Sequence, residues 1–158
     1  WPQVFLGIAF NWGALLAWVA VTGSLSAAPI ALYLGGIAWT LFYDTIYAHQ
    51  DIEDDALIGV KSTARLFGDN SPRWLLVFQI TTMILLALST ILALGQADGF
   101  MALVAGLVGV WAMGLHLYWQ LNRLDTNDPQ VCMILFRSNR DTGLLLFAAF
   151  AISAMLAA

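Results

Sequence analysis

The chain has 158 residues, of which 61% are hydrophobic and only 10% are charged, and its formal net charge is −4. Soluble domains carry roughly 25% charged residues, so this composition predicts an integral membrane protein rather than a soluble domain. The chain has no block of Lys and Arg that would bind nucleic acid, and its single cysteine, Cys132, excludes an internal disulfide or a Cys-based zinc site.

Five apolar segments are long enough, or nearly so, to cross a bilayer as helices, which takes about 20 residues each. They cover residues 2–21, 29–50, 74–94, 100–121 and 142–158. The second is short as a purely apolar run, so we expect its helix to continue through the acidic residues that follow, towards Asp51. The segments lack the alternating pattern of barrel strands. The expected fold is therefore all-α, a polytopic transmembrane helical bundle that forms one domain over residues 1–158.

The connecting segments alternate in charge. The connections near residues 23–26 and 95–99 carry no Lys or Arg, whereas all six basic residues follow either the second or the fourth segment: Lys61, Arg65, Arg73, Arg123, Arg137 and Arg140. The positive-inside rule places both basic connections on the cytoplasmic side. The pattern predicts a multi-pass protein whose polar chemistry faces the cytoplasm.

Five of the ten acidic residues lie within twelve positions, from Asp44 to Asp55. If this segment is helical, Asp44, Asp51 and Asp55 lie within roughly 40° of one another on one face, with Tyr47 beside them. Carboxylates brought together repel one another unless a cation neutralises them, and hard divalent cations prefer oxygen ligands. The pattern predicts a divalent-cation site at the end of a span, able to hold a phosphate-bearing substrate. The alternative is a solvated loop that happens to be acidic.

Basic and polar residues follow the acids. Gly59 provides the backbone freedom that ends a helix, and Lys61 then lies where its ammonium group could meet an anion held by the metal. Lys61 and Arg65 could instead mark membrane topology only. Asn139, with arginines on both sides, precedes the fifth segment, where this group forms either an ordinary membrane anchor or a phosphate or carboxylate contact.

These residues resemble a known family. The sequence from Asp44 to Ala64, which opens Asp-Thr-Ile-Tyr-Ala and closes Gly-Val-Lys-Ser-Thr-Ala, is similar to the second aspartate-rich motif of the UbiA prenyltransferases. Within that family it most resembles the bacterial 4-hydroxybenzoate polyprenyltransferases of ubiquinone biosynthesis. The segments around Phe10-Asn11-Trp12-Gly13 and Phe136-Arg137-Ser138-Asn139-Arg140 are similar as well, so the resemblance covers nearly the whole chain.

The resemblance implies a fold, an activity and a set of site residues. Family members have about nine spans and two acidic motifs, and this chain is similar to the carboxyl-terminal half. The chain opens directly in an apolar run, so we expect an amino-terminal half of the same protein to supply the first motif, without which the fragment would be inactive. The implied location is a bacterial inner membrane, and the implied reaction joins a polyprenyl diphosphate to 4-hydroxybenzoate with Mg²⁺ assisting the departure of diphosphate.

Site roles follow from the same resemblance, motif position by motif position. Asp51 and Asp55 correspond to metal-binding acids, and Asp44 and Asp54 correspond to supporting oxygen ligands. The catalytic set is Asp51, Asp55 and Lys61, and the substrate-binding set is Tyr47, Lys61, Arg65 and Asn139. Two rival functions remain: a prenyltransferase for a naphthoate, haem or chlorin acceptor, and a cation-coupled transporter whose intramembrane carboxylates bind the ion.

Overall fold

The fold is described from a computed structural model, which covers residues 1–95 and 99–157. The elements are helices throughout this part of the chain: α1 (Pro2–Thr22), α2 (Ala27–Ala48), α3 (Ile52–Ile58), α4 (Thr63–Phe67), the 3₁₀ helix η1 (Gly68–Asn70), α5 (Ser71–Leu94), α6 (Phe100–Arg123) and α7 (Pro129–Ala157). The predicted all-α bundle is confirmed. The predicted connection at residues 95–99 lies partly outside the described residues, as does the predicted end of the last segment at residue 158.

The long helices begin and end where local chemistry allows. Pro2 and Pro72 stand in the first turns of α1 and α5, where a missing backbone N–H costs nothing. Gly23 ends α1 in a left-handed conformation with φ 72°. Asp128 precedes α7, and its Oδ1 accepts hydrogen bonds from the N–H groups of Gln130 at 2.9 Å and Val131 at 3.2 Å. This side chain satisfies donors that a helix start would otherwise leave unpaired.

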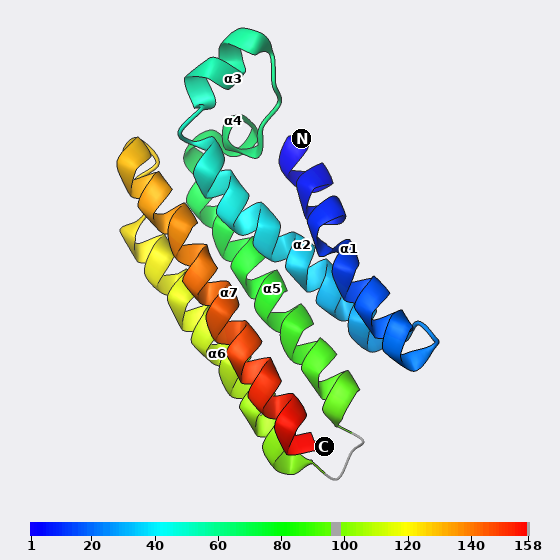
Figure 1. The fold of residues 1–158 in the computed structure, drawn as a ribbon. Helices are drawn as coiled ribbons and strands as arrows, with labels where there is room; N and C mark the ends of the chain where they lie inside the picture. The colour runs from blue at the N-terminus through cyan, green and yellow to red at the C-terminus, as the bar shows by residue number, and fades with distance from the viewer. Residues whose placement is uncertain (96–98, 158) are drawn as a thin grey trace.

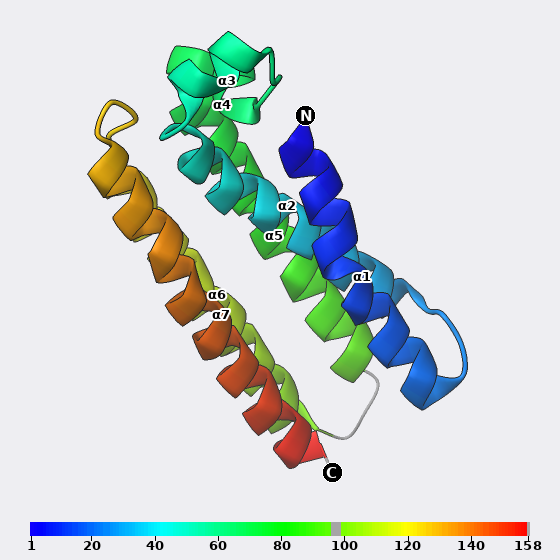
Figure 2. The same cartoon turned by 45° about the horizontal axis from the view of Figure 1, so that its top comes forward.

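The long helices form two groups. α2 lies between α1 and α5, and α6 pairs with α7, which also contacts α2 (Figure 1). Figure 2 shows the α6 and α7 pair running side by side along the length of the bundle. α3, α4 and the turn that joins α6 to α7 lie at the same end as the amino terminus (Figure 1). We call this end, formed by residues 49–70 and 124–128, the polar end. The connections after α2 and α6 therefore share one end, as the charge pattern predicts, although Arg137 and Arg140 lie further along the chain, within α7.

Small residues let the helices approach closely. A β-carbon on Gly36 of α2 would collide with the side-chain amide of Asn11 in α1. That amide donates to the hydroxyl of Thr40 at 3.0 Å, which ties α1 to α2. Close contact through small residues and interhelical hydrogen bonds is how helices associate where lipid removes the hydrophobic driving force.

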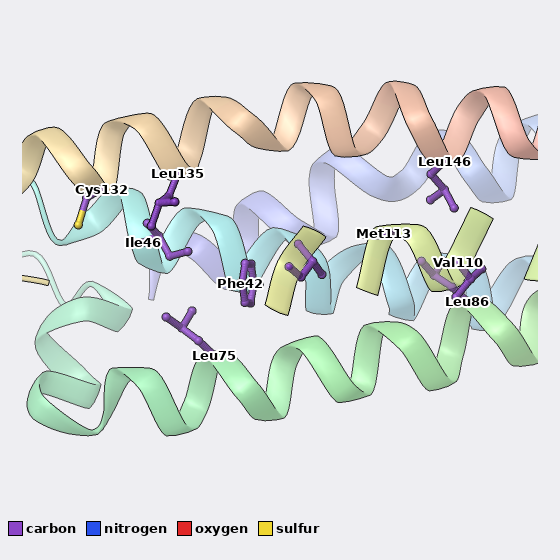
Figure 3. Close-up of a cluster of buried hydrophobic side chains, with 10 residues drawn as sticks. Phe42, Ile46, Leu75, Leu86, Val110, Met113, Cys132, Leu135 and Leu146 are labelled. Carbon is purple, nitrogen blue, oxygen red and sulfur yellow. The ribbon is translucent and has the colours of Figure 1, made fainter. Parts of the chain in front are cut away.

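The buried core runs between α2, α5, α6 and α7. Figure 3 shows Phe42 and Ile46 of α2 directed towards Leu75 of α5 and Leu135 of α7. Cys132 belongs to the same cluster and is buried. By contrast, large apolar side chains on α1 point outward, including Phe5 at 73% and Phe10 at 72% exposure. Such a surface is typical of a helix that contacts lipid.

Four described helical segments are long and apolar enough to cross a membrane: Pro2–Thr22, Thr63–Leu94, Phe100–Arg123 and Pro129–Ala157. Three of these contain the first, third and fourth predicted segments. α2 is 22 residues long but is not among the four, because Asp44 and three tyrosines lower its hydropathy. A fifth span at α2 stays a prediction.

Two predicted boundaries are wrong. The second segment does not continue as a helix to Asp51, because α2 ends at Ala48 and a turn follows. The last helix begins at Pro129 rather than near residue 142. Arg137, Asn139 and Arg140 therefore lie inside α7 rather than in a connection before it. The run of four polar side chains from Arg137 to Arg140 indicated a connection, but it lies within a helix whose first turn is capped by Asp128.

Candidate functional site

The end of α2 is fixed by a buried histidine. His49 follows the last residue of α2. Its backbone N–H donates to the carbonyl oxygen of Ile46 at 3.3 Å, and that of Gln50 donates to the carbonyl oxygen of Tyr47 at 3.0 Å, which tightens the turn. Its Nε2 is hydrogen-bonded to the Ser71 hydroxyl of α5 at 3.0 Å, and both side chains are buried. The polar bond holds the end of α2 against the start of α5, so His49 is a packing residue in this arrangement.

The end of α2 at Ala48 separates the acidic residues that were predicted to share one helix face. Asp44 is half-buried on α2, whereas Asp51 precedes α3 and accepts through its carbonyl oxygen from the N–H of Asp55 at 2.8 Å. The prediction that Asp44, Asp51 and Asp55 share one continuous helix face is therefore wrong. Asp51 and Asp55 stay one helical turn apart, while Asp44 lies on the other side of the turn.

Residues 1–95 and 99–157 contain no cluster of three or more His, Cys, Asp or Glu side chains that could hold a metal ion. Mg²⁺ is usually bound by one or two carboxylates together with substrate phosphates and several waters, rather than by a cage made of protein alone. Two oxygen-donor side chains one turn apart fit that mode. Asp51 and Asp54 are exposed and Asp55 is half-buried, so these carboxylates are open to an approaching ligand.

The segment that carries Lys61 is held on both sides. Gly59 ends α3 with φ 77°, as its freedom predicts. Further on, the backbone N–H of Thr63 donates to Gln3 Oε1 at 3.1 Å, and the hydroxyls of Thr63 and Thr45 are hydrogen-bonded at 2.7 Å. Lys61 is exposed between these two fixed points, at the same end of the bundle as the carboxylates.

Arg65 is exposed, and its side chain forms hydrogen bonds with the backbone of its own chain. Its Nη1 donates to the carbonyl oxygen of Asp55 at 2.9 Å and also to that of Val60. These bonds close the loop that contains Lys61 against α3. The predicted contact between Arg65 and a substrate phosphate is untested, and the role that the structure gives Arg65 is to fix the shape of this loop.

Tyr47 faces α7. Its ring lies 4.7 Å from that of Phe136, centroid to centroid, and the Tyr43 ring lies 5.9 Å from the same phenylalanine. Trp39 continues the row, with its ring edge-on to Tyr43 at 5.7 Å. Because these three α2 residues are four apart, they follow one helix face. The result is an aromatic row that leads from the polar end into the bundle.

A cavity of about 790 Å³ lies beside this row, between α2 and α7. Its lining comprises Trp39, Tyr43, Ile134, Phe136, Arg137, Ser138, Asn139, Arg140 and Asp141. Arg140 is paired with Asp141 at 2.9 Å, and both side chains are largely exposed. The cavity thus combines aromatic and aliphatic walls with polar groups, a composition that suits an amphipathic ligand.

Asn139 is buried inside α7, not placed in a loop as the sequence predicted. Its side chain is hydrogen-bonded to Trp39 of α2 and to Gln120 of α6. Neither partner was predicted from the sequence. The available signal was Gln120, an amide within a largely apolar helix, because a polar group at membrane depth needs a partner.

The chain is similar to proteins of known family. A model of the UbiA prenyltransferase family matches residues 1–140. The mitochondrial 4-hydroxybenzoate polyprenyltransferase of Bos taurus is 47% identical over 148 residues, which are 93% of this chain and 38% of the relative. The protein of the same name from Drosophila pseudoobscura pseudoobscura is 48% identical over 159 residues, covering 100% of this chain and 38% of the relative.

A plant relative is equally similar. The mitochondrial 4-hydroxybenzoate polyprenyltransferase of Arabidopsis thaliana is 46% identical over 151 residues, 94% of this chain and 35% of the relative. The chain therefore spans little more than a third of the length of the relatives it matches. A search of solved structures found no significant match.

These relatives contradict the predicted location in a bacterial inner membrane with the site facing the cytoplasm. They come from animals and a plant, and their names describe them as mitochondrial. The bacterial location was implied by the family resemblance, and the cytoplasmic side by the distribution of Lys and Arg, which indicates only which connections share one side of a membrane. This distribution carries no information about which membrane that is.

Proposed function

Because the chain belongs to the UbiA prenyltransferase family, we propose that its protein transfers a polyprenyl group from polyprenyl diphosphate to 4-hydroxybenzoate, at the ring carbon ortho to the hydroxyl. The relatives that bear this name share nearly half of their aligned residues with the chain. The reaction would serve ubiquinone biosynthesis.

The observation that carries the proposal is the arrangement at the polar end. Asp51, Asp55 and the exposed Lys61 lie at one end of an apolar bundle. The aromatic row and the cavity between α2 and α7 continue from there into the bundle. A donor with a charged head and a long hydrocarbon tail needs this combination of a polar mouth and an apolar interior.

Each group has a part in the proposed chemistry. Magnesium, when bound, would neutralise charge on the departing diphosphate, and Asp51 and Asp55 would hold it, with Asp44 and Asp54 as supporting acids. Lys61 would donate to phosphate oxygens as a flexible point charge. Tyr47 would lie next to the cavity with its ring against that of Phe136, where an aromatic face favours positive charge at the allylic carbon. The ring carbon of 4-hydroxybenzoate would form a bond to the allylic carbon as the bond from that carbon to diphosphate breaks. Loss of the ring proton would then restore aromaticity.

The test is prenyl transfer to labelled 4-hydroxybenzoate by the full-length gene product in proteoliposomes, with polyprenyl diphosphate as donor and with or without Mg²⁺. We expect Asp51→Asn and Asp55→Asn each to lower kcat by about 10²- to 10³-fold, the usual cost of removing one electrostatic contribution to the transition state. Asp69→Asn is the matched control. Asp69 is an exposed carboxylate at the same end, on η1, and its loss should leave the rate within about twofold.

Three outcomes would contradict the proposal. Full activity of both Asp51→Asn and Asp55→Asn would refute the roles of these acids. Prenyl transfer to a dihydroxynaphthoate but not to 4-hydroxybenzoate would keep the reaction class and replace the acceptor. Cation flux into the proteoliposomes without any prenyl transfer would favour the transporter.

A further inference from the structure

Two buried amides face each other between α6 and α7. Gln120 has no exposed surface and Asn139 is 7% exposed. Asn139 Nδ2 donates to Gln120 Oε1 at 3.0 Å, and Gln120 Nε2 donates to Asn139 Oδ1 at 3.3 Å. Asn139 Nδ2 also lies within hydrogen-bond distance of the Leu135 carbonyl oxygen, at 3.1 Å. Burying two amides in an apolar bundle is costly unless they are paired, and these two are paired reciprocally.

The pair has a third member. Trp39 Nε1 of α2 donates to Asn139 Oδ1 at 3.0 Å. An indole N–H can only donate, so the atom of Asn139 that faces it must be the oxygen. Asn139 Nδ2 is thereby directed to Gln120. The tryptophan and the two amides form one consistent network across three helices.

The other edges of the indole are also confined. Tyr43 lies edge-on to it, with ring planes at 81°. On α7, a β-carbon added to Gly143 would lie 3.2 Å from Trp39 Cη2, which is closer than ordinary van der Waals contact. Glycine at position 143 therefore leaves room for the ring in its present position. Trp39 is held at its nitrogen by Asn139, packs against Tyr43, and has at its far edge only the room that Gly143 leaves.

We infer that the Gln120–Asn139 pair is a positioning element that fixes Trp39 as a wall of the cavity between α2 and α7, and that this wall contacts the hydrocarbon chain of the prenyl donor. Trp39 lines the cavity. It precedes Tyr47 by eight residues, so it lies about 12 Å further into the bundle at 1.5 Å per residue. Arg137 and Arg140 line the same cavity, but the indole is apolar apart from its N–H, which already donates to Asn139, so its ring contacts the isoprenoid tail rather than the diphosphate. The inference rests on the proposed prenyl transfer.

Two variants test the position of the indole. Trp39→Phe keeps an aromatic ring but removes the N–H that Asn139 accepts. Gly143→Ala leaves Trp39 chemically intact and pushes on its far edge, while alanine improves helix propensity. We expect each to raise KM for the polyprenyl diphosphate about three- to tenfold, the range of one neutral hydrogen bond. The KM for 4-hydroxybenzoate and kcat should change by less than about twofold, because neither variant touches the polar end.

Gly13→Ala is the matched control. Gly13 lies within α1, and a β-carbon there meets no atom within 4 Å. Thermal unfolding of each variant in detergent separates positioning from folding. A purely structural role predicts a lower Tm for Trp39→Phe, an unchanged or higher Tm for Gly143→Ala, and an unchanged donor KM in both.

The outcomes are distinct. A donor KM that rises in Gly143→Ala without loss of Tm, and stays at the wild-type value in Gly13→Ala, supports the inference. Wild-type transfer with an unchanged donor KM in both Trp39→Phe and Gly143→Ala overturns the inference and leaves the proposed function standing. If the wild-type protein transfers no prenyl group, the proposed function is wrong and the inference falls with it.

Discussion

α6 and α7 approach each other closely at Gly109, so replacing this glycine by alanine should loosen the pair of helices. A β-carbon at position 109 would collide with the β-carbon of Ala149 and lie 3.7 Å from the Ala149 Cα. The collision cannot be relieved by rotating a side chain, because a methyl group attached directly to a helix backbone has no alternative rotamer. One helix has to move.

Two opposing contributions set the magnitude. Glycine to alanine within a helix gains about 1 kcal/mol of intrinsic propensity, whereas inserting a methyl group into a packed interface costs about 1–3 kcal/mol. We therefore expect Gly109→Ala to lower the free energy of unfolding by about 0–2 kcal/mol. The propensity gain is separated from the collision by Gly13→Ala, whose β-carbon meets open space. The difference between the two variants should be about 1–3 kcal/mol.

Removing the colliding partner isolates the effect further. In an Ala149→Gly background, Gly109→Ala makes the same propensity change without meeting a β-carbon at position 149. The double-mutant cycle should thus give a coupling energy of about 1–3 kcal/mol between positions 109 and 149. The assay is unfolding of the full-length gene product in detergent micelles, followed by circular dichroism as a denaturing detergent is titrated.

A shift of α6 against α7 in Gly109→Ala should also disturb the hydrogen bonds between Gln120 and Asn139. Gln120 and Asn139 lie eleven residues along α6 and ten residues back along α7 from the Gly109 contact, so both pairs depend on one antiparallel register. A coupling energy within about 0.3 kcal/mol of zero, the scatter for independent sites, would refute this account. So would equal stability changes in Gly109→Ala and Gly13→Ala.

Three further predictions concern the polar end and the core. Gly59→Ala should destabilise the protein by about 1–2 kcal/mol because φ is 77° at the end of α3, and Gly59→Asn should cost less in the same unfolding assay; equal costs would contradict the left-handed backbone. Arg65→Ala should speed tryptic cleavage after Lys61 at least about threefold, because the backbone carbonyls that Arg65 holds would be released. An unchanged cleavage rate together with a raised KM for the polyprenyl diphosphate would instead support direct contact between Arg65 and the substrate. Cys132, which is buried, should react with a water-soluble maleimide only after denaturation, and rapid labelling of the native protein would show that α7 packs differently.

Local sequence patterns predicted much of the architecture. Long apolar runs without alternation can only be helices in a bilayer, and Pro2 and Gly23 stand at the ends of the first one, where their backbone preferences place them. The motif from Asp44 to Ala64 also led to the correct family. Such features can be read from the chain because each depends on residues a few positions apart.

The acidic segment shows the limit of that reasoning. A helical wheel placed Asp44, Asp51 and Asp55 on one face, on the assumption that the helix continued. The helix ends instead at Ala48, and His49 is hydrogen-bonded to Ser71, 22 positions later. A break of this kind depends on a tertiary partner, and no periodicity within the segment could reveal it.

The sequence by itself determined that the chain is a bundle of apolar helices, that the connections after its second and fourth apolar segments share one side, and that it belongs to a prenyltransferase family. Hydropathy, charge and a local motif are properties of the residues themselves. Only the tertiary structure decided that Arg65 fastens the Lys61 loop, and that Asn139 joins Gln120 to Trp39 across three helices. The physical reason is that a buried polar group must find a partner, and in this bundle the partner of Trp39 lies 100 positions away in the sequence.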